Sequence, residues 1–307
     1  MSGNSETSRA RHLSVVCAIV ILIGSLIAIS ASRAQDPPPD EEARRLWDAE
    51  FLKKRGSATT SSAPRKNPGY RRATPKPPTI DEKAQGEMIG VTIWRLRSSS
   101  AADNQDARLL LTDEESKDKV ELTPERVEAE TAFAEGDRVR LSIESPRDGF
   151  LYVIDREQYA DGSMSDPYLI FPTLRSRGGD NAVKAGKVIE LPERTAFRLK
   201  PMRPDYKGEL LTLLITAEPL AEVKVGPRMV KLDNELVAQW EKRWRVPVER
   251  FEMIGGAGKA YTKAEKEAGQ EGARLLTQED ELPQTLYRVI AKRGDPLLIT
   301  VPLRIGK

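Results

Sequence analysis

The sequence predicts a mainly β protein, an antiparallel, immunoglobulin-like β-sandwich with two helices in its C-terminal part, preceded by a disordered tether. Apolar and polar residues alternate from Arg138 to Glu144, which is the period of a half-buried strand. The run Phe150–Ile154 is almost continuously apolar and rich in aromatic and β-branched residues, as in a strand buried on both faces. Turn residues, Pro146–Gly149, separate the two runs, and Tyr168–Phe171 predicts a third strand. Together they predict a β-meander.

Residues 1–34 have the pattern of a secretory signal peptide. Basic Arg9 and Arg11 precede an uncharged apolar run, residues 13–30, and Ser32-Arg33-Ala34 fits a cleavage site. The run is also long enough for an uncleaved signal anchor, which would keep the protein in contact with the membrane. With either outcome we expect an extracytoplasmic protein, in the periplasm or secreted.

Removing residues 1–34 would remove the only histidine, His12, and the only cysteine, Cys17. A chain without them has no thiolate nucleophile, no Cys/His zinc site and no Ser-His-Asp triad. Lys+Arg would fall from 49 to 46 and Asp+Glu from 47 to 46, which gives no net charge. We therefore expect no nucleic-acid partner.

Residues 35–86 are predicted to be a proline-rich, basic linker that contains one short amphipathic helix. Ala43, Trp47 and Phe51 fall on one helical face, after acidic residues that favour a helix start. This helix could dock on the folded domain, on a partner or at a membrane surface, or form only transiently. The rest of the segment lacks a hydrophobic pattern and is predicted to be disordered.

The folded domain is predicted to span residues 87–307. It begins with an alternating strand, Gly90–Arg97, and continues after the meander with apolar strands at Val188–Leu191, Phe197–Leu199 and Leu210–Thr216. Apolar residues at helical spacing predict one helix from Leu232 to Trp244 and another from Lys259 to Leu276. The strands Thr285–Ala291 and Leu297–Leu303 are predicted to form a hairpin that closes the sheet of the meander.

The segment from Arg138 to Leu220 resembles a known family. Its motifs are Gly149-Phe150-Leu151-Tyr152-Val153, Asp161-Gly162, Leu169-Ile170-Phe171-Pro172, Asp180-Asn181, Lys184-Ala185-Gly186 and Glu209-Leu210-Leu211. The family is a bacterial domain of unknown function that occurs in exported proteins and beside caspase-like peptidase or protein-kinase domains. The resemblance implies an extracytoplasmic β-rich module and supplies no catalytic residues.

Two polar, glycine-containing loops, 155–167 and 175–181, are the predicted binding elements, because loops on a rigid sheet commonly carry binding residues. The candidate residues are Tyr159, Asp161, Asp166, Tyr168, Arg175, Arg177, Asp180 and Asn181. The leading hypothesis is a non-enzymatic cell-envelope module that binds a protein or polymer and needs no cofactor. The alternatives are a carboxylate-dependent hydrolase of cell-wall glycans, with two carboxylates about 5–10 Å apart, and a self-associating structural domain.

Three further patterns have simpler explanations. Asp155, Asp161, Ser163, Ser165 and Asp166 could supply oxygens to calcium, but their order differs from an EF-hand and Asp-Gly-Ser is ordinary turn chemistry. The stretch 255–260 lacks the spacing of a phosphate-binding loop. Arg293-Gly294-Asp295, a cell-attachment tripeptide, is expected to be a tight turn.

Overall fold

The computed structural model describes residues 51–55, 69–77, 86–112, 117–270 and 273–306. All of them belong to one compact unit, residues 36–307. The expected signal sequence, with its apolar segment 13–30, and most of the expected amphipathic helix lie outside the described residues. Among the helices that are described, none has the length and apolar character needed to cross a membrane.

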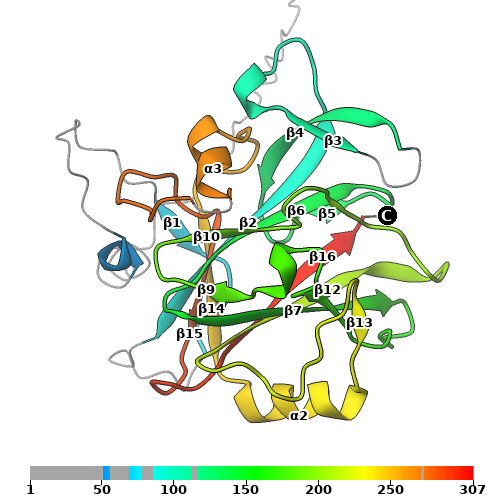
Figure 1. Cartoon of the computed structure of the whole chain (residues 1–307), viewed down its shortest axis with the longest axis vertical. Helices are drawn as coiled ribbons and strands as arrows, with labels where there is room; N and C mark the ends of the chain where they lie inside the picture. Colours follow the sequence, from blue (N-terminus) through cyan, green and yellow to red (C-terminus); the bar gives the residue numbers. More distant parts are fainter. Residues whose placement is uncertain (1–50, 56–68, 78–85, 113–116, 271–272, 307) are drawn as a thin grey trace, which may run out of the picture. The chain divides into compact units, whose positions relative to one another are not determined.

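The described strands form two facing sheets, so the predicted mainly β, antiparallel sandwich is confirmed (Figure 1). Sheet 1 has nine described strands: β1 Tyr70–Arg72, β2 Glu87–Ser98, β3 Leu109–Thr112, β4 Lys119–Val127, β6 Arg138–Glu144, β10 Val188–Leu191, β11 Phe197–Arg198, β14 Val248–Met253 and β15 Thr285–Val289. Strand β2 is central: β6 pairs with one side of it, and β15 and β4 pair with successive halves of the other.

Sheet 2 has seven described strands: β5 Ala132–Phe133, β7 Gly149–Tyr159, β8 Tyr168–Phe171, β9 Ala182–Val183, β12 Tyr206–Thr216, β13 Val230–Lys231 and β16 Leu297–Ile305. The long strand β12 lies between β7 and β16 and pairs with both in antiparallel register. The short pair of β16 and β5 is parallel.

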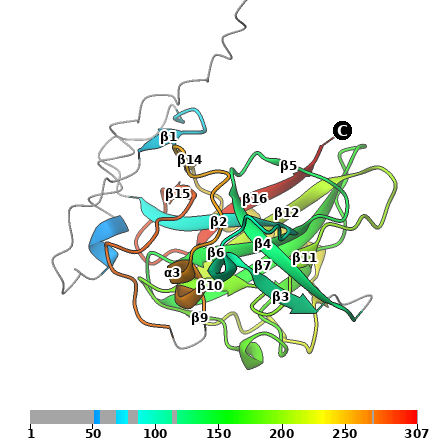
Figure 2. The ribbon, with the colours of Figure 1, turned by 90° about the horizontal axis from the view of Figure 1, so that it is seen from above.

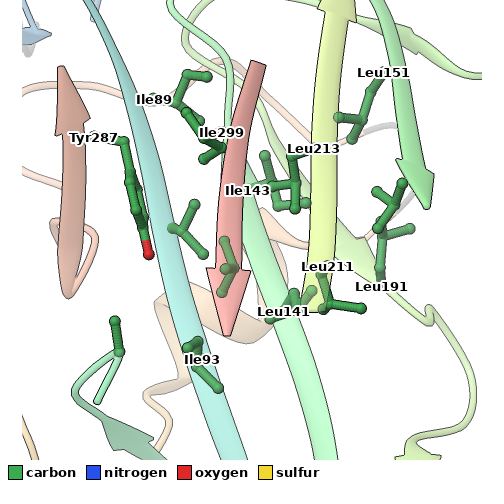
Figure 3. Close-up of a cluster of buried hydrophobic side chains, with 14 of the residues drawn as sticks. Ile89, Ile93, Leu141, Ile143, Leu151, Leu191, Leu211, Leu213, Tyr287 and Ile299 are labelled. Carbon is green, nitrogen blue, oxygen red and sulfur yellow. The ribbon is translucent and has the colours of Figure 1, made fainter. Parts of the chain in front are cut away.

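The core lies between the two sheets and is built by the inward residues of alternating strands. Ile89 and Ile93 of β2 and Ile143 of β6 pack toward Leu213 of β12 and Ile299 of β16 (Figure 3). All five are buried. Because burying one such side chain contributes about 1.5–3 kcal/mol, this interface accounts for a domain that has no disulfide among its described residues.

The predicted meander is wrong in one respect: β6 and β7 lie in different sheets. β6 pairs with β2 and β10, whereas β7 pairs with β12 and β8. The short turn between them therefore carries the chain across the sandwich. This arrangement places Ile143 of β6 and Leu151 of β7 in the same core from opposite sides. The apolar alternation within each strand is compatible with this arrangement and with pairing in one sheet.

The predicted C-terminal hairpin is also wrong. Both strands exist, but β15 pairs with β14 and β2 in sheet 1, while β16 pairs with β12 in sheet 2. The segment 290–296 between them connects the two sheets. β16 pairs with β12, and β12 in turn pairs with β7, so β16 does join the sheet that contains β7 and β8. The sequence did not indicate β12 as the neighbour of β16.

The first C-terminal helix, α2 (Asn234–Trp244), confirms the prediction closely. Asp233 caps it by accepting hydrogen bonds from the backbone N–H groups of Glu235 and Leu236, at 2.7 and 3.0 Å. Val237 and Trp240 on its buried face pack on the outer face of sheet 2. Figure 1 shows the helix at the lower edge of the fold.

The second helix, α3 (Lys263–Ala268), is much shorter than the predicted 259–276. Thr262 and Glu265 form a capping box at its start, and the chain leaves the helix at Gly269. A Cβ atom at residue 269 would lie 2.2 Å from Cδ of Glu190. The glycine therefore ends the helix where the backbone passes closely over β10.

Described residues before Glu87 also belong to the fold, so the folded unit begins earlier than the predicted boundary. Phe51 is buried against Tyr70 and Phe251, and β1 extends sheet 1 beside β14 (Figure 2). Arg55 donates from Nε and Nη2 to Glu144, at 2.8 and 2.5 Å, and from Nη1 to the carbonyl of Asp280. The C-terminal end of the expected amphipathic segment therefore docks on the folded domain.

Replacing Gly208 with alanine is expected to destabilise the protein by about 1–3 kcal/mol, the usual cost of overpacking a well-packed site. Gly208 has φ +132° at a β-bulge in β12, and a Cβ atom there would lie 2.0 Å from the carbonyl oxygen of Leu303. Urea denaturation measures the effect. Gly294→Ala is the control, because that glycine also has a positive φ but has open space around its Cβ position. An equal loss in both variants would contradict the crowding argument.

Candidate functional site: the Arg203 surface and the carboxylates beneath it

The two loops that were predicted to bind together lie at opposite ends of β7. Residues 155–159 are the last part of that strand, and the loop itself is residues 160–167. The second loop is attached near the other end, where the backbone N–H of Leu151 donates to the carbonyl of Asn181 and Nδ2 of Asn181 donates back, at 2.9 and 3.0 Å. At a rise of about 3.3 Å per residue, Leu151 and Tyr159 are about 26 Å apart, so the loops do not form one compact site.

Two of the candidate residues near the first loop, Tyr159 and Asp161, come together around Arg203. The guanidinium of Arg203 lies 4.0 Å from the centre of the Tyr159 ring and 3.3 Å from Oδ2 of Asp161. Hydrogen bonds from Ser163, together with Arg203, lower the pKa of Asp161 to about 2. Arg203 was not predicted as a site residue, because only the contact with Tyr159 reveals its position.

The two other candidates from this region form a separate group at the edge of sheet 2. Asp166 is 2.5 Å from Nζ of Lys231 and accepts a hydrogen bond from Nδ2 of Asn234 at 2.8 Å. These contacts lower the pKa of Asp166. Tyr168 pairs in register with Lys231. This group therefore fastens the loop to β13 and to the start of α2.

The residues of loop 175–181 are mostly used to close the loop on itself. Arg177 contacts Oδ2 of Asp180 at 3.4 Å and Oε1 of Glu193 at 3.7 Å. Asp180 accepts a hydrogen bond from the backbone N–H of Ala182 at 2.9 Å. Arg175 is exposed. Of the predicted residues here, Arg175 alone projects from the turn without a role in holding it.

Two exposed methionines flank the Arg203 cluster. Met164 is 44% exposed and Met202 is 66% exposed. Met164 forms a β-bridge with Gln158, and the backbone N–H of Met202 donates to the carboxylate of Glu157 at 3.2 Å. We call the set Tyr159, Asp161, Met164, Met202 and Arg203 the Arg203 surface. Large exposed methionines beside a stacked arginine are typical of protein-binding surfaces.

A cluster of three acidic residues lies beneath this surface: the buried Glu157 and Glu209 and the half-buried Asp155. They continue the inward face of β7 and β12, where Leu151, Val153 and Leu211 form the core, and Glu157 and Glu209 are directly opposite in register. Glu157 accepts a hydrogen bond from the Tyr159 hydroxyl at 2.9 Å, and Glu209 accepts one from the Tyr206 hydroxyl at 2.7 Å. The cluster thus anchors the residues that carry the Arg203 surface.

Asp155 and Glu209 lie close enough for their carboxyl groups to interact, and a hydrogen bond between them would require one of the two groups to be protonated. Oδ1 of Asp155 and Oε2 of Glu209 are buried and receive no hydrogen bond from an N–H or O–H donor of the described residues. Burial raises the pKa of Asp155, and the neighbouring Glu209 raises it further. Burial also raises the pKa of Glu209. The pair therefore retains a proton that two separate carboxylates would release.

The arrangement fits neither of the other chemistries considered for this region. Glycosidases need two carboxyl groups separated by about 5–10 Å, whereas Asp155 and Glu209 are within hydrogen-bond reach of each other. Within the described part of the chain, no group of acidic side chains is arranged to hold a metal ion. The acidic side chains that could supply oxygens to calcium diverge, since Asp161 contacts Arg203 and Asp166 contacts Lys231.

A second buried polar cluster holds α3 on sheet 1. Glu190 accepts a hydrogen bond from Nη2 of Arg140 at 3.0 Å and another from the hydroxyl of Tyr261. Burial raises the pKa of Glu190 to about 7, although Arg140 opposes this change. Because every partner is a residue of the same fold, this cluster has a structural role in seating α3.

The carboxylate cluster was missed at the level of sequence, although a signal for it exists. Leu151, Val153, Asp155, Glu157 and Tyr159 share one face of a strand by their period of two. Acidic residues on a face that is otherwise apolar indicate a buried polar group.

Comparisons with family models, curated proteins and solved structures gave no match to this chain.

Proposed function

We propose that this protein is a non-enzymatic interaction module of the cell envelope that binds a partner protein through the Arg203 surface. The observation that carries the proposal is the exposed pair Met164 and Met202 beside Arg203, which is stacked on Tyr159. A methionine side chain adapts its shape to a partner, and an arginine on an aromatic ring is already ordered before binding.

Rigid support beneath the surface strengthens the proposal. Tyr159 and the backbone of Met202 are both hydrogen-bonded to Glu157, which is buried. A surface that is ordered in the free protein loses less conformational entropy when it binds. The extracytoplasmic location is part of the proposal and is supported by the apolar run 13–30 and the small residues that follow it.

The closely interacting pair Asp155 and Glu209 gives no support to a glycan hydrolase. The loop 175–181 is too distant to contribute to the same interface. Self-association remains the competing function. Light scattering of the purified protein distinguishes it, because an interface between copies would give a concentration-dependent mass.

The Met202→Ser and Arg203→Ala double variant is expected to weaken partner binding at least tenfold, a loss of about 1.4 kcal/mol. A photo-crosslinking residue at position 164 would first identify the partner in cells, and calorimetry with the purified partner would then measure the Kd. Met229→Ser is the matched control, since Met229 is 64% exposed and lies outside the Arg203 surface.

An unchanged Kd in the double variant would refute the proposed surface, as would adducts that form equally from position 229. A crosslink to a wall polymer instead of a protein would refute the proposed partner class.

A further inference from the structure

A second feature, a groove beside α2, is lined by residues of β12 and β16 in sheet 2 and of β14 and β15 in sheet 1, and it has the dimensions of a ligand site. Its volume is about 490 Å³, within the roughly 300–1,000 Å³ typical of small-molecule sites. Leu210 and Pro302 supply an apolar floor, and Val246 and Val248 supply part of the wall. We call this cavity the α2 groove. Its lining shares no residue with the Arg203 surface, although Gln158 of the lining is bridged to Met164 of that surface.

The charges around the α2 groove favour an anion. Three arginines line it, Arg245, Arg250 and Arg304, against two acidic residues, Glu130 and Glu241. Glu130 serves two of these arginines at once: it is 2.7 Å from Nη1 of Arg250 and also pairs with Arg304. Arg245, exposed at the end of α2, forms no ion pair with any residue that the structure describes. One guanidinium therefore remains available to a ligand.

Buried polar atoms at the α2 groove also lack partners. Tyr287 is only 3% exposed, and its hydroxyl forms no well-aligned hydrogen bond among the described residues, although the side chain of Arg250 lies beside it. Nε of Arg250 is likewise buried and without a hydrogen bond, its nearest carboxylate oxygen being Oε1 of Glu252 at 3.6 Å. Leaving a buried donor unsatisfied costs about 1–3 kcal/mol, and a ligand oxygen that reached both donors would recover that cost.

We propose that the α2 groove binds an amphipathic anion, with its carboxylate or phosphate group at Arg245, Arg250 and Arg304 and its apolar body on Leu210 and Pro302. The planar guanidinium matches both kinds of oxyanion through paired hydrogen bonds. The Tyr287 hydroxyl donates to the same head group. The apolar floor distinguishes such a ligand from a simple inorganic ion.

Calorimetric titration of the purified protein tests the proposal with four probes: n-octanoate, n-octyl phosphate, inorganic phosphate and n-octylamine. We expect octanoate or octyl phosphate to bind, and the tighter of the two identifies the head group. Inorganic phosphate is expected to bind at least tenfold more weakly. Equal binding by inorganic phosphate, equal binding by octylamine or no binding by either octyl anion would each overturn the proposal.

Variants locate the site. Arg245→Ala and Arg304→Ala should each raise the Kd of the bound octyl anion at least fivefold, because both side chains are exposed and can be removed without disturbing the core. Arg194→Ala, at an exposed arginine outside the groove, is the matched control. Tyr287→Phe should weaken binding while leaving the melting temperature of the free protein unchanged or higher. An unchanged Kd in all three groove variants would overturn the assignment.

Discussion

Replacing Glu249 with alanine is expected to destabilise the protein by about 3–5 kcal/mol, because removing one partner of a buried ion pair leaves its counterion uncompensated. Glu249 is fully buried and Arg288 is only 2% exposed. Nη1 of Arg288 donates to Oε2 of Glu249 at 3.0 Å, and Arg72 pairs with the other oxygen. Chemical denaturation measures the change.

The loss should come from the weaker compensation of the buried Arg288 charge rather than from the missing packing volume. A double variant, Glu249→Leu with Arg288→Met, removes both charges and fills the same space, so it should recover most of the stability lost in Glu249→Ala. Arg72 is 15% exposed and can turn toward water when Glu249 is absent. A loss below about 1 kcal/mol for Glu249→Ala would contradict the argument, since it would match an exposed ion pair.

Alternation along each strand made the β class and most of the strands predictable, and Asp233 made the start of α2 predictable. The same alternation could not assign strands to sheets. An inward residue such as Ile143 or Leu151 needs an apolar neighbour, but the neighbour can lie beside it in one sheet or across the core in the other. For this reason β6 and β7, and likewise β15 and β16, were wrongly paired.

The length of α3 and the long-range contacts of Phe51 and Arg203 could not be predicted for similar reasons. The pattern from Lys259 to Leu276 is broadly helical, but Gly269 ends α3 because a side chain there would meet Glu190, which lies 79 residues earlier in the chain. Phe51 was recognised as apolar, but its burial against Phe251 depends on a strand that is distant in sequence. Arg203 became a site residue only through its contact with Tyr159. Each case depends on a long-range contact that local patterns do not encode.

The carboxylate cluster implies a dependence of stability on pH, and this is the second large effect. Burial raises the pKa values of Asp155 and Glu209 in the folded protein, while an unfolded chain releases its carboxyl protons near pH 4. The stability contributed by the shared proton is therefore complete below about pH 4 and is lost as the pH rises through the folded pKa values. Glu190 and Glu252, whose pKa values burial raises to about 7, act in the same direction.

Substituting Glu209 with glutamine should remove the part of this dependence that belongs to the pair. The Tyr206 hydroxyl can still donate to Oε1, while the new amide group takes the place of Oε2 and donates to Asp155 without a shared proton. Above pH 4 we expect the free energy of unfolding of the wild type to fall faster than that of the variant, by up to about 1.4 kcal/mol per pH unit, the slope for one proton. Urea denaturation between pH 4 and pH 8 measures both curves.

The exposed Glu218→Gln substitution is the control and should leave the slope unchanged. Parallel curves for wild type and Glu209→Gln would mean that the pair holds no proton in the folded state. A steeper fall in the wild type would mean that the buried pair loses its proton in this pH range, and this ionisation would also affect the Arg203 surface. Glu157 lies opposite Glu209 in the sheet and holds both Tyr159 and Met202, so ionisation of the pair would place added negative charge beside the residue that anchors the Arg203 surface. Partner binding would then weaken with rising pH over the same range in which stability falls.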